Sequence, residues 1–356
     1  MKEFKKIVIN GRFLTQKLTG VQRYALEITK ALDDLIANES IPYELAIPTD
    51  FKPSLELKNI KIIKLGSHNG IKWEQLDLSK YLKKQNALGI HLCNSVPLFG
   101  PKGFCCVHDI TYKVNPQYIT TKHLALSKIW HLTQYKNAIK KSLHLFTVSN
   151  FSKNEILENY NVKSDKISVA YNGWQHFSTT IEEGTSLSKF PQLKPHEYYF
   201  SLATMAKNKN FIWVVNEAKL NPDKIFAVAG NIDVKKLGDT IGETPKNLIK
   251  LGYVSDSEAK LLMKECKAFL FPSTYEGFGI PPLEAMAMGA PVICSNAACL
   301  PEVFQKSVHY INPNENIQNL DTLLEERIEP ASIILEKYSW TKSAQIYLDN
   351  IKSILQ

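Results

Sequence analysis

The segment 268–295 constrains the fold of this 356-residue chain more strongly than any other. It opens with a short apolar run over 268–271, which is typical of a buried parallel strand. A loop with two glycines follows, and then Pro281 and Pro282 suit the first turn of a helix, where a missing backbone N–H costs nothing. A second apolar run over 292–294 predicts the next strand. The segment therefore predicts a strand–helix–strand unit whose helix N-terminus points towards a ligand site.

Two carboxylates stand at the start of this predicted helix. Glu276 lies in the glycine loop and Glu284 in the first helical turn. The loop residues Gly277, Phe278 and Gly279 and the helix N-terminus suit a phosphate, whereas the carboxylates accept hydrogen bonds from sugar hydroxyls. The combination indicates a nucleotide-sugar site. Two simpler interpretations stay open, because a Glu in a first helical turn also complements the helix dipole, and the loop lacks the third glycine of the dinucleotide fingerprint.

The length and pattern of the chain indicate two domains. Strand-like and helix-like segments alternate up to residue 170 and again from residue 198, and 44% of the residues are apolar. We predict an N-terminal Rossmann-like domain over 1–175, a linker over 176–196 and a C-terminal Rossmann-like domain over 197–340. The predicted fold class is α/β, with two doubly wound domains facing across a cleft.

Composition favours a cytoplasmic protein. No run of about eighteen apolar residues predicts a transmembrane helix, and the N-terminus lacks the apolar core of a signal peptide. The six cysteines show no Cys-x-x-Cys spacing and mostly lie in apolar surroundings. We therefore expect reduced, buried thiols and not metal ligands.

The charge of the chain is uneven. Of the net charge of +8, residues 1–170 hold +11 and the remainder −3. The predicted helix 122–142 is both basic and aromatic, so it could lie on an anionic membrane surface. A packing helix with a solvated basic face is the simpler interpretation. No nucleic-acid-binding module accompanies the basic half, so we expect no nucleic-acid partner.

Polar residues also follow two predicted strands of the first domain. Gly20 and Arg23 lie where the strand 6–10 passes through a loop to a helix, and His108 and Asp109 follow a later strand. Ligands of doubly wound sheets bind at such strand ends. The alternatives are that Arg23 pairs with a neighbouring acid and that a backbone carbonyl satisfies His108.

Taken together, these segments resemble the retaining glycosyltransferases of family four, which have the GT-B fold. The resemblance rests on two Glu separated by seven residues in and after a Glu-Gly-Phe-Gly loop, on Thr-Gly-x-x-Arg-Tyr at 19–24 and on His-Asp at 108–109. It implies that the last helix, about 341–356, packs back on the first domain, whose end Asn172 marks. It implies catalytic roles for His108, Glu276 and Lys209. The donor-binding residues would be Gly20, Thr204, Lys207, Lys209, Glu276, Gly277, Phe278, Gly279 and Glu284, with Arg23, Asp109 and Asn172 as further candidates.

The phosphate region departs from the family pattern. The family usually places an Arg, and five residues later a Lys, after the first strand of its second domain. Lys209 fits the Lys position, but Thr204 stands at the Arg position. Lys207 could supply the missing positive charge. Without Lys207, the anion site has fewer cationic side chains than is usual in the family.

The resemblance implies a retaining hexosyltransferase that uses a nucleoside diphosphate sugar and glycosylates a hydroxyl of a growing, lipid-linked surface glycan. The pattern is similar to bacterial mannosyltransferases of O-antigen (lipopolysaccharide) and capsule synthesis, so GDP-mannose is the expected donor. No Asp-x-Asp pair ends a strand of the second domain, so we expect no metal and no cofactor besides the donor substrate. The enzyme would be cytoplasmic, with a peripheral position on the inner face of the cell membrane. The alternatives are a nucleotide-sugar epimerase of the same fold and a non-catalytic glycan- or nucleotide-binding protein.

Overall fold

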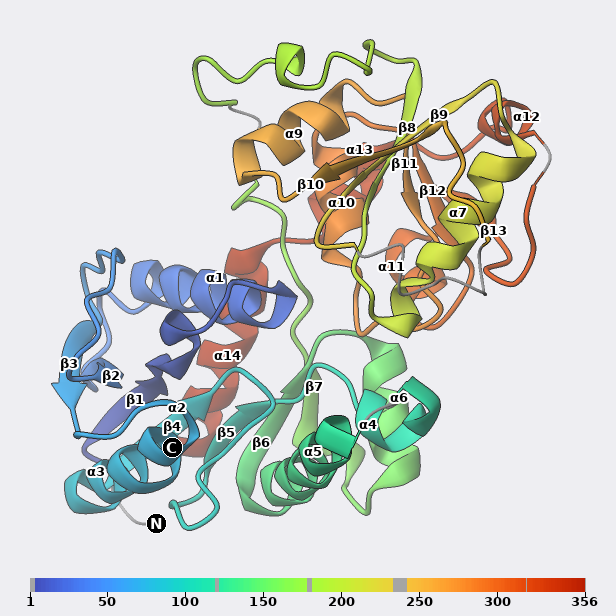
Figure 1. The fold of residues 1–356 in the computed structure, drawn as a ribbon. Helices are drawn as coiled ribbons and strands as arrows, with labels where there is room; N and C mark the ends of the chain where they lie inside the picture. The colour runs from blue at the N-terminus through green and yellow to red at the C-terminus, as the bar shows by residue number, and fades with distance from the viewer. Residues whose placement is uncertain (1–3, 119–121, 178–180, 233–241, 318, 356) are drawn as a thin grey trace. The chain divides into compact units, whose positions relative to one another are not determined.

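The computed structural model describes residues 4–118, 122–177, 181–232, 242–317 and 319–355. The chain divides into two compact units, the first formed by 1–173 and 339–356 and the second by 174–338 (Figure 1). Each unit is built on one parallel sheet. The prediction of two doubly wound α/β units is confirmed.

The sheet of the first unit has seven described strands in the order β3-β2-β1-β4-β5-β6-β7. The strand order reverses at β1, which pairs with β2 on one side and β4 on the other, and this is the usual ligand position of a doubly wound sheet. Helices cover both faces, which is why the inner strands are continuous apolar runs. The strands are β1 (Lys6–Asn10), β2 (Tyr43–Pro48), β3 (Lys61–Leu65), β4 (Ala87–His91), β5 (Gly103–Cys106), β6 (Ser142–Thr147) and β7 (Ile167–Val169).

The final helix of the chain belongs to the first unit. Tyr347 of this helix, α14, stacks on Phe146 of β6 with ring centroids 3.7 Å apart. The hydroxyl of Tyr347 also lies 3.1 Å from that of Tyr24 in α1, and all three rings are buried. The helices of the unit are α1 (Gly20–Leu35), α2 (Gly70–Lys72), α3 (Ser79–Gln85), α4 (Thr111–Val114), α5 (Lys122–Lys141), α6 (Asn150–Asn159) and α14 (Trp340–Leu355), with the π-helix η2 (Trp73–Leu78) and the 3-10 helices η1 (Gly11–Thr15), η3 (Pro116–Tyr118) and η4 (Ser164–Lys166).

The sheet of the second unit has six described strands in the order β10-β9-β8-β11-β12-β13. Trp213 of α7 packs with Tyr199 and Phe226 in its buried core. The strands are β8 (Tyr198–Leu202), β9 (Ile225–Ala229), β10 (Leu248–Gly252), β11 (Ala268–Phe271), β12 (Val292–Ser295) and β13 (His309–Ile311). The helices are α7 (Phe211–Leu220), α9 (Asp256–Lys264), α10 (Ile280–Ala287), α11 (Leu300–Phe304), α12 (Leu320–Leu324) and α13 (Ala331–Lys337), with the 3-10 helices η5 (Leu187–Lys189) and η6 (Lys207–Lys209).

The segment predicted as a linker, 176–196, lies within the second unit, and the division falls between Gly173 and Trp174. The described part of this segment is attached to α9. The backbone N–H of Glu182 donates to Ser257 Oγ at 2.8 Å, and the Lys189 ammonium lies 2.9 Å from the Glu258 carboxylate. The segment lacks hydrophobic periodicity because it folds as turns and the short helix η5, which side-chain and backbone hydrogen bonds hold in place.

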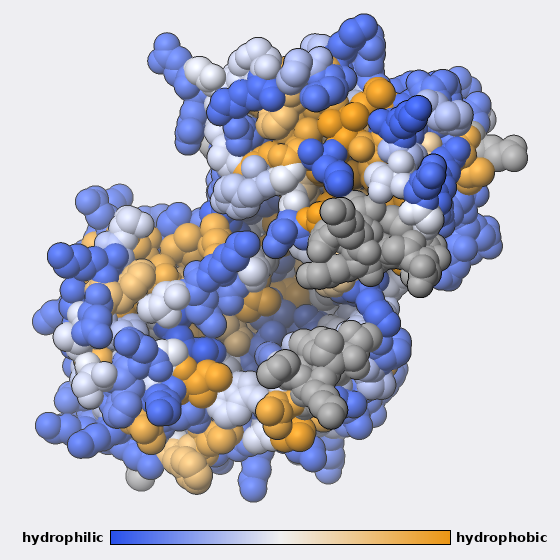
Figure 2. All heavy atoms as spheres, viewed as in Figure 1, coloured by the Kyte–Doolittle hydropathy of each residue, from blue (hydrophilic) through white to orange (hydrophobic). Residues whose placement is uncertain are grey.

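Hydrophilic side chains cover most of the face shown in Figure 2, and separate hydrophobic patches lie between them. Five of the six cysteines are buried, Cys93 is half-buried, and all six are free thiols. Among the described residues, no helix is both long enough and apolar enough to span a bilayer.

Candidate functional site

The glycine loop of the second unit ends at a helix start, as the segment 268–295 predicts. Gly279 is the N-cap of α10 and has a φ of +98°, and a Cβ there would lie 2.8 Å from Leu300 Cδ2. Glycine meets both the backbone and the steric requirement of this position. Of the first three residues of α10, Ile280 has a backbone N–H whereas Pro281 and Pro282 have none, so the helix offers a ligand this N–H and the positive end of its dipole. The Phe278 side chain is buried and meets the Tyr338 ring edge-on at 5.2 Å, so it anchors the loop to the core.

Lys209 and Glu276 form an ion pair beside this loop. Their Nζ and Oε1 atoms are 2.7 Å apart, and 27% and 14% of the two side chains are exposed, so a ligand can still approach them. The Lys209 ammonium also lies 5.4 Å from the centre of the Phe271 ring. The pair brings together a cation suited to phosphate and a carboxylate suited to hydroxyls.

Two asparagines hold the Lys209 segment against the glycine loop. Asn208 accepts the Thr274 N–H at 2.8 Å through its carbonyl and donates from Nδ2 to the Tyr275 carbonyl at 3.0 Å. Asn210 has a φ of +51° and donates to the Pro272 and Pro313 carbonyls. These bonds explain why Lys209 and Glu276, which are 67 positions apart, meet at the carboxyl ends of β8 and β11.

Glu284 is almost fully buried, with 9% of its surface exposed, and accepts a hydrogen bond from His176 Nε2 at 2.9 Å through Oε1. Within the described residues, Oε2 has no such bond and stays available to a ligand hydroxyl. Sequence reasoning did not identify His176, which it placed in the linker. No local signal marks it, because the two residues are 108 positions apart.

The two other predicted phosphate residues are exposed. Thr204 Oγ1 accepts the Ala206 N–H at 3.3 Å, and Lys207 starts η6 without an ion pair to any described acid. A further position, Gly230, was not singled out from the sequence. Its φ is +128°, and a Cβ there would lie 2.0 Å from the Ala203 carbonyl oxygen, so it permits close backbone approach at the ends of β8 and β9. A glycine directly after an apolar strand is the signal that identifies it.

The predicted residues of the first unit lie at strand and helix ends. Gly20 is exposed and begins α1, and Asp109 Oδ1 accepts the Thr111 N–H at 2.9 Å. Arg23 Nη1 lies 3.9 Å from Glu27 Oε1, which is the neighbouring acid of the simpler interpretation. Asn172 is buried, and its Oδ1 has no hydrogen-bond partner among the described residues.

His108 has the contact that the simpler interpretation expects. Its Nε2–H donates to the Leu92 carbonyl at 2.8 Å, and 5% of its surface is exposed. The ring also meets Tyr24 edge-on at 4.7 Å. The backbone N–H of His108 donates to Asn94 Oδ1 at 2.7 Å, so the strand end is held from both sides.

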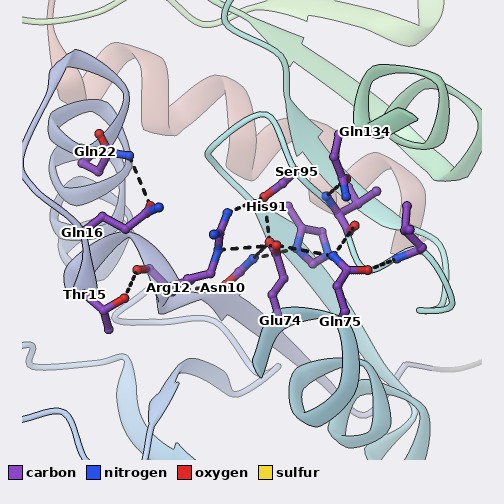
Figure 3. Close-up of polar contacts among 12 residues, drawn as sticks. Asn10, Arg12, Thr15, Gln16, Gln22, Glu74, Gln75, His91, Ser95 and Gln134 are labelled. Carbon is purple, nitrogen blue, oxygen red and sulfur yellow. Dashed lines mark hydrogen bonds and ion pairs between the residues drawn. The ribbon is translucent and has the colours of Figure 1, made fainter. Parts of the chain in front are cut away.

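A buried polar cluster at the carboxyl ends of β1 and β4 was not predicted (Figure 3). Glu74, from the π-helix η2, is fully buried and accepts from Asn10 Nδ2 at 2.6 Å and from Ser95 Oγ at 2.7 Å. Arg12 Nε lies 3.4 Å from the other Glu74 oxygen, and Arg12 Nη2 donates to Ser95 Oγ at 3.1 Å. Burial lowers the pKa of neighbouring His91 to about 3, so this ring is neutral near pH 7.

The cluster has the features of a functional site. Its carboxylate orients the Arg12 side chain beside the switch point of the sheet, where ligands of this architecture bind. π-helices are rare in proteins as a whole, but those that occur are often found at functional sites. The strand-end rule finds Asn10 and His91 from the sequence, but Glu74 and Ser95 come from other segments and have no local signal.

Comparison with known proteins identifies the second unit. The family Glycosyl transferases group 1 matches residues 186–337, which include the ion pair, the glycine loop and Glu284. The second unit is a group 1 glycosyltransferase domain. Among the described residues, no group of three His, Cys, Asp or Glu side chains has an arrangement that would hold a metal ion.

The chain is similar to O-antigen enzymes, as the motifs predict. It is 32% identical over 229 residues to the O-antigen chain mannosyltransferase RfbU of Salmonella typhimurium, covering 61% of this chain and 60% of that protein. It is 25% identical over 281 residues to the serotype-specific mannosyltransferase WbdA of Escherichia coli, covering 72% of this chain and 34% of WbdA. The chain therefore spans about a third of the length of WbdA.

Solved structures share the fold of the whole chain. Anabaena Alr3699/HepE in complex with UDP and glucose matches with a TM-score of 0.69 and 17% identity, over 98% of this chain and 100% of that chain. Sucrose-phosphate synthase from Thermosynechococcus elongatus matches with a TM-score of 0.71 and 14% identity, over 98% of both chains. The GT-B fold that the motifs imply is confirmed.

Proposed function

We propose that the protein is a retaining glycosyltransferase that transfers a hexose from a nucleoside diphosphate sugar to a hydroxyl of a growing glycan. The observation that supports this most is the ion pair of Lys209 and Glu276 beside the glycine loop that leads into α10, with Glu284 further along the same helix. A helix N-terminus beside two carboxylates matches the two parts of a nucleotide sugar, its diphosphate and its hydroxyl-bearing rings.

The second unit would stabilise the leaving diphosphate. Negative charge grows on this group as the glycosidic bond breaks, and it would meet the Lys209 ammonium, the amides of 277–279 and the positive end of the α10 dipole. One well-placed donor contributes about 3–4 kcal/mol in comparable oxyanion sites. The ion pair with Glu276 orients Lys209 before the donor binds. In this proposal no divalent metal is needed, because these groups neutralise the diphosphate.

The carboxylates would bind the hydroxyls of the donor. Glu284 has one oxygen engaged by His176 and offers the other to the ribose. Glu276 would accept from the transferred sugar. We propose that His108 also contacts the transferred sugar. The alternative is that His108 has a structural role alone, because its ring already donates to the Leu92 carbonyl.

The proposed donor is GDP-mannose, and the proposed acceptor is a lipid-linked surface glycan. The support is the similarity to RfbU and WbdA, which are mannosyltransferases. The decisive experiment incubates the protein and a Lys209→Ala variant with GDP-mannose and a panel of UDP and dTDP sugars in the presence of a lipid-linked glycan, and measures nucleoside diphosphate release. We expect the fastest release from GDP-mannose and at least a hundredfold loss in the variant. Equal release by parent and variant would reject the proposed site.

The same experiment distinguishes the two alternatives. An epimerase would convert or release the sugar without any acceptor, whereas a binding protein would bind the nucleotide sugar and release nothing. NMR of the glycoside formed gives its anomeric configuration, and retention of the donor configuration is the expected outcome.

We further propose that the first unit docks on an anionic membrane, where a lipid-linked acceptor would be presented. The outer face of α5 exposes 72% of Leu126 and 63% of Ile129, and about two and three turns after Ile129 it exposes Lys136 and Lys140. Apolar side chains followed by lysines suit insertion beside anionic headgroups, where each lysine contributes about 1 kcal/mol, screened by salt. In vesicle sedimentation we expect binding to anionic but not neutral lipid and weaker binding by Leu126→Ser/Ile129→Ser. Equal binding to both lipids would leave α5 as a solvated packing helix.

A further inference from the structure

His176 has no role of its own in the proposed function, although it contacts one of the proposed donor-binding residues. Its side chain is 2% exposed, and its Nε2–H donates to Glu284 Oε1 at 2.9 Å. The contact joins the first residues of the second unit to α10, which lies far away in the sequence. A buried donor on a ligand-binding carboxylate can act on the ligand through that carboxylate.

The core of the second unit fixes the backbone of Glu284 but not its side chain. The two neighbours of Glu284 in α10, Leu283 and Ala285, are fully buried, so this part of the helix cannot shift freely. The Glu284 side chain has several rotatable bonds, and among the described residues its carboxylate has one hydrogen bond, the one from His176. His176 is therefore the contact that selects one orientation of the carboxylate and leaves Oε2 open.

The segment that carries His176 is itself held in place. Trp174 Nε1 donates to the Leu335 carbonyl of α13 at 2.9 Å. Gln175 Nε2 donates to the carbonyl of Tyr338, the C-cap of the same helix, at 3.0 Å. These two bonds fix the residues directly before His176, so its ring is a rigid support for Glu284 before any ligand binds.

The simplest explanation of the contact is that it fastens the segment 174–177 to α10. A buried acid with a structural role in the same unit shows what such a carboxylate looks like. Glu217 Oε1 accepts from Asn316 Nδ2 and from the Ile317 N–H, and its Oε2 accepts from Asn221 Nδ2 at 3.3 Å. Both oxygens of Glu217 are thus engaged by the protein. Glu284 differs, because the described residues engage one oxygen and leave the other to a ligand.

We propose that His176 is a positioning residue that orients Glu284 for the ribose of the donor. The proposal rests on the proposed function, since it requires Glu284 to accept from the ribose hydroxyls. A carboxylate that is already oriented loses less entropy when the ligand binds, and the cost of ordering one such side chain corresponds to about a three- to tenfold change in affinity. Full discrimination between nucleotides with and without ribose hydroxyls would therefore require His176.

The test compares nucleotides that differ only in these hydroxyls. Calorimetry of the whole chain gives the dissociation constants of GDP and 2′,3′-dideoxy-GDP, with UDP and 2′,3′-dideoxy-UDP in parallel. The ratio of the two constants reports the ribose contact alone, because a partly unfolded variant loses affinity for both nucleotides by the same factor. The variants are His176→Phe, which removes the N–H donor, and His176→Gln, whose side-chain amide keeps a donor.

The matched control is Asn316→Leu, which removes the donor that lies 2.7 Å from the structural acid Glu217. We expect the parent to bind GDP at least about tenfold more tightly than 2′,3′-dideoxy-GDP. His176→Phe should lower this ratio about three- to tenfold. His176→Gln and Asn316→Leu should keep the ratio of the parent.

The possible failures of this proposal and of the proposed function give different results. If His176→Phe discriminates as the parent does, His176 only fastens its segment, and the positioning role is overturned while the ribose contact stands. A ratio lowered equally in His176→Gln or in Asn316→Leu would also overturn it, because the effect would not come from the N–H on Glu284. If the parent itself does not discriminate, the ribose contact of the proposed function fails, and the positioning role fails with it.

Discussion

The contact between Glu284 and His176 leads to a quantitative prediction about nucleotide binding. Glu284 is a buried acid in the second turn of α10, not in the first turn as the sequence predicts, and its Oε1 is committed to His176 while its Oε2 is open. If Oε2 accepts a ribose hydroxyl, Glu284→Ala removes a hydrogen bond to a charged group, which contributes about 1.5–3 kcal/mol. The dissociation constant for GDP should then rise roughly 10- to 150-fold.

Glu284→Gln removes the negative charge of this side chain but keeps its shape. The amide oxygen can still accept from His176, so the protein should keep its stability, and one hydrogen bond to ribose changes from charged to neutral. The difference between these two kinds of bond is about 1–1.5 kcal/mol, which predicts a five- to tenfold weaker affinity. Glu284→Ala should in addition lower the unfolding midpoint, because it leaves the His176 N–H, on a side chain only 2% exposed, without this acceptor.

The assay is calorimetric titration with GDP, and with UDP in parallel, combined with thermal unfolding of each variant. Glu217→Gln is the matched control, since Glu217 is a fully buried acid of the same unit that accepts from Asn316 and from the Ile317 N–H at 2.7 Å. It should change stability and leave nucleotide affinity unchanged. If both Glu284 variants fold and bind nucleotide as tightly as the parent, Glu284 serves only to hold His176, and the ribose contact is refuted.

Three further predictions concern metal, the first unit and pH. Chelation with EDTA should leave turnover unchanged, whereas loss of activity that magnesium or manganese restores would contradict the metal-free proposal. His108→Ala should bind GDP like the parent but transfer sugar at least tenfold more slowly, and a parent-like rate would show that its bond to Leu92 is its whole role. Because the folded-state pKa of His91, about 3, lies below its ordinary value, the unfolded chain takes up the proton first as pH falls below about 6.5. Stability should fall by about 2 kcal/mol between pH 6.5 and 5, and His91→Asn should remove this part of the slope in a denaturant titration.

The sequence by itself determined the architecture and the local geometry of the candidate site. The apolar runs predict strands because both faces of a parallel sheet are buried, and the order of glycines and prolines after residue 271 predicts the helix start of α10. These features depend on near neighbours in the chain, which is why they are readable from a pattern. The family motifs then associated Lys209 with Glu276, and the structure places the two side chains in contact.

The tertiary structure decided which distant residues complete the sites. His176 reaches Glu284 across 108 positions, and Glu74 reaches Asn10 across 64, and neither pair shares a helix face or a strand register that a periodicity could reveal. The segment 176–196 belongs to the second unit for the same reason. Hydrogen bonds to α9 hold this segment in place, and a hydrophobic stripe of its own does not. Local chemistry specifies which elements form, whereas the packing of whole elements specifies which polar groups they bring together, because a buried polar group takes its partner from whatever segment the fold places beside it.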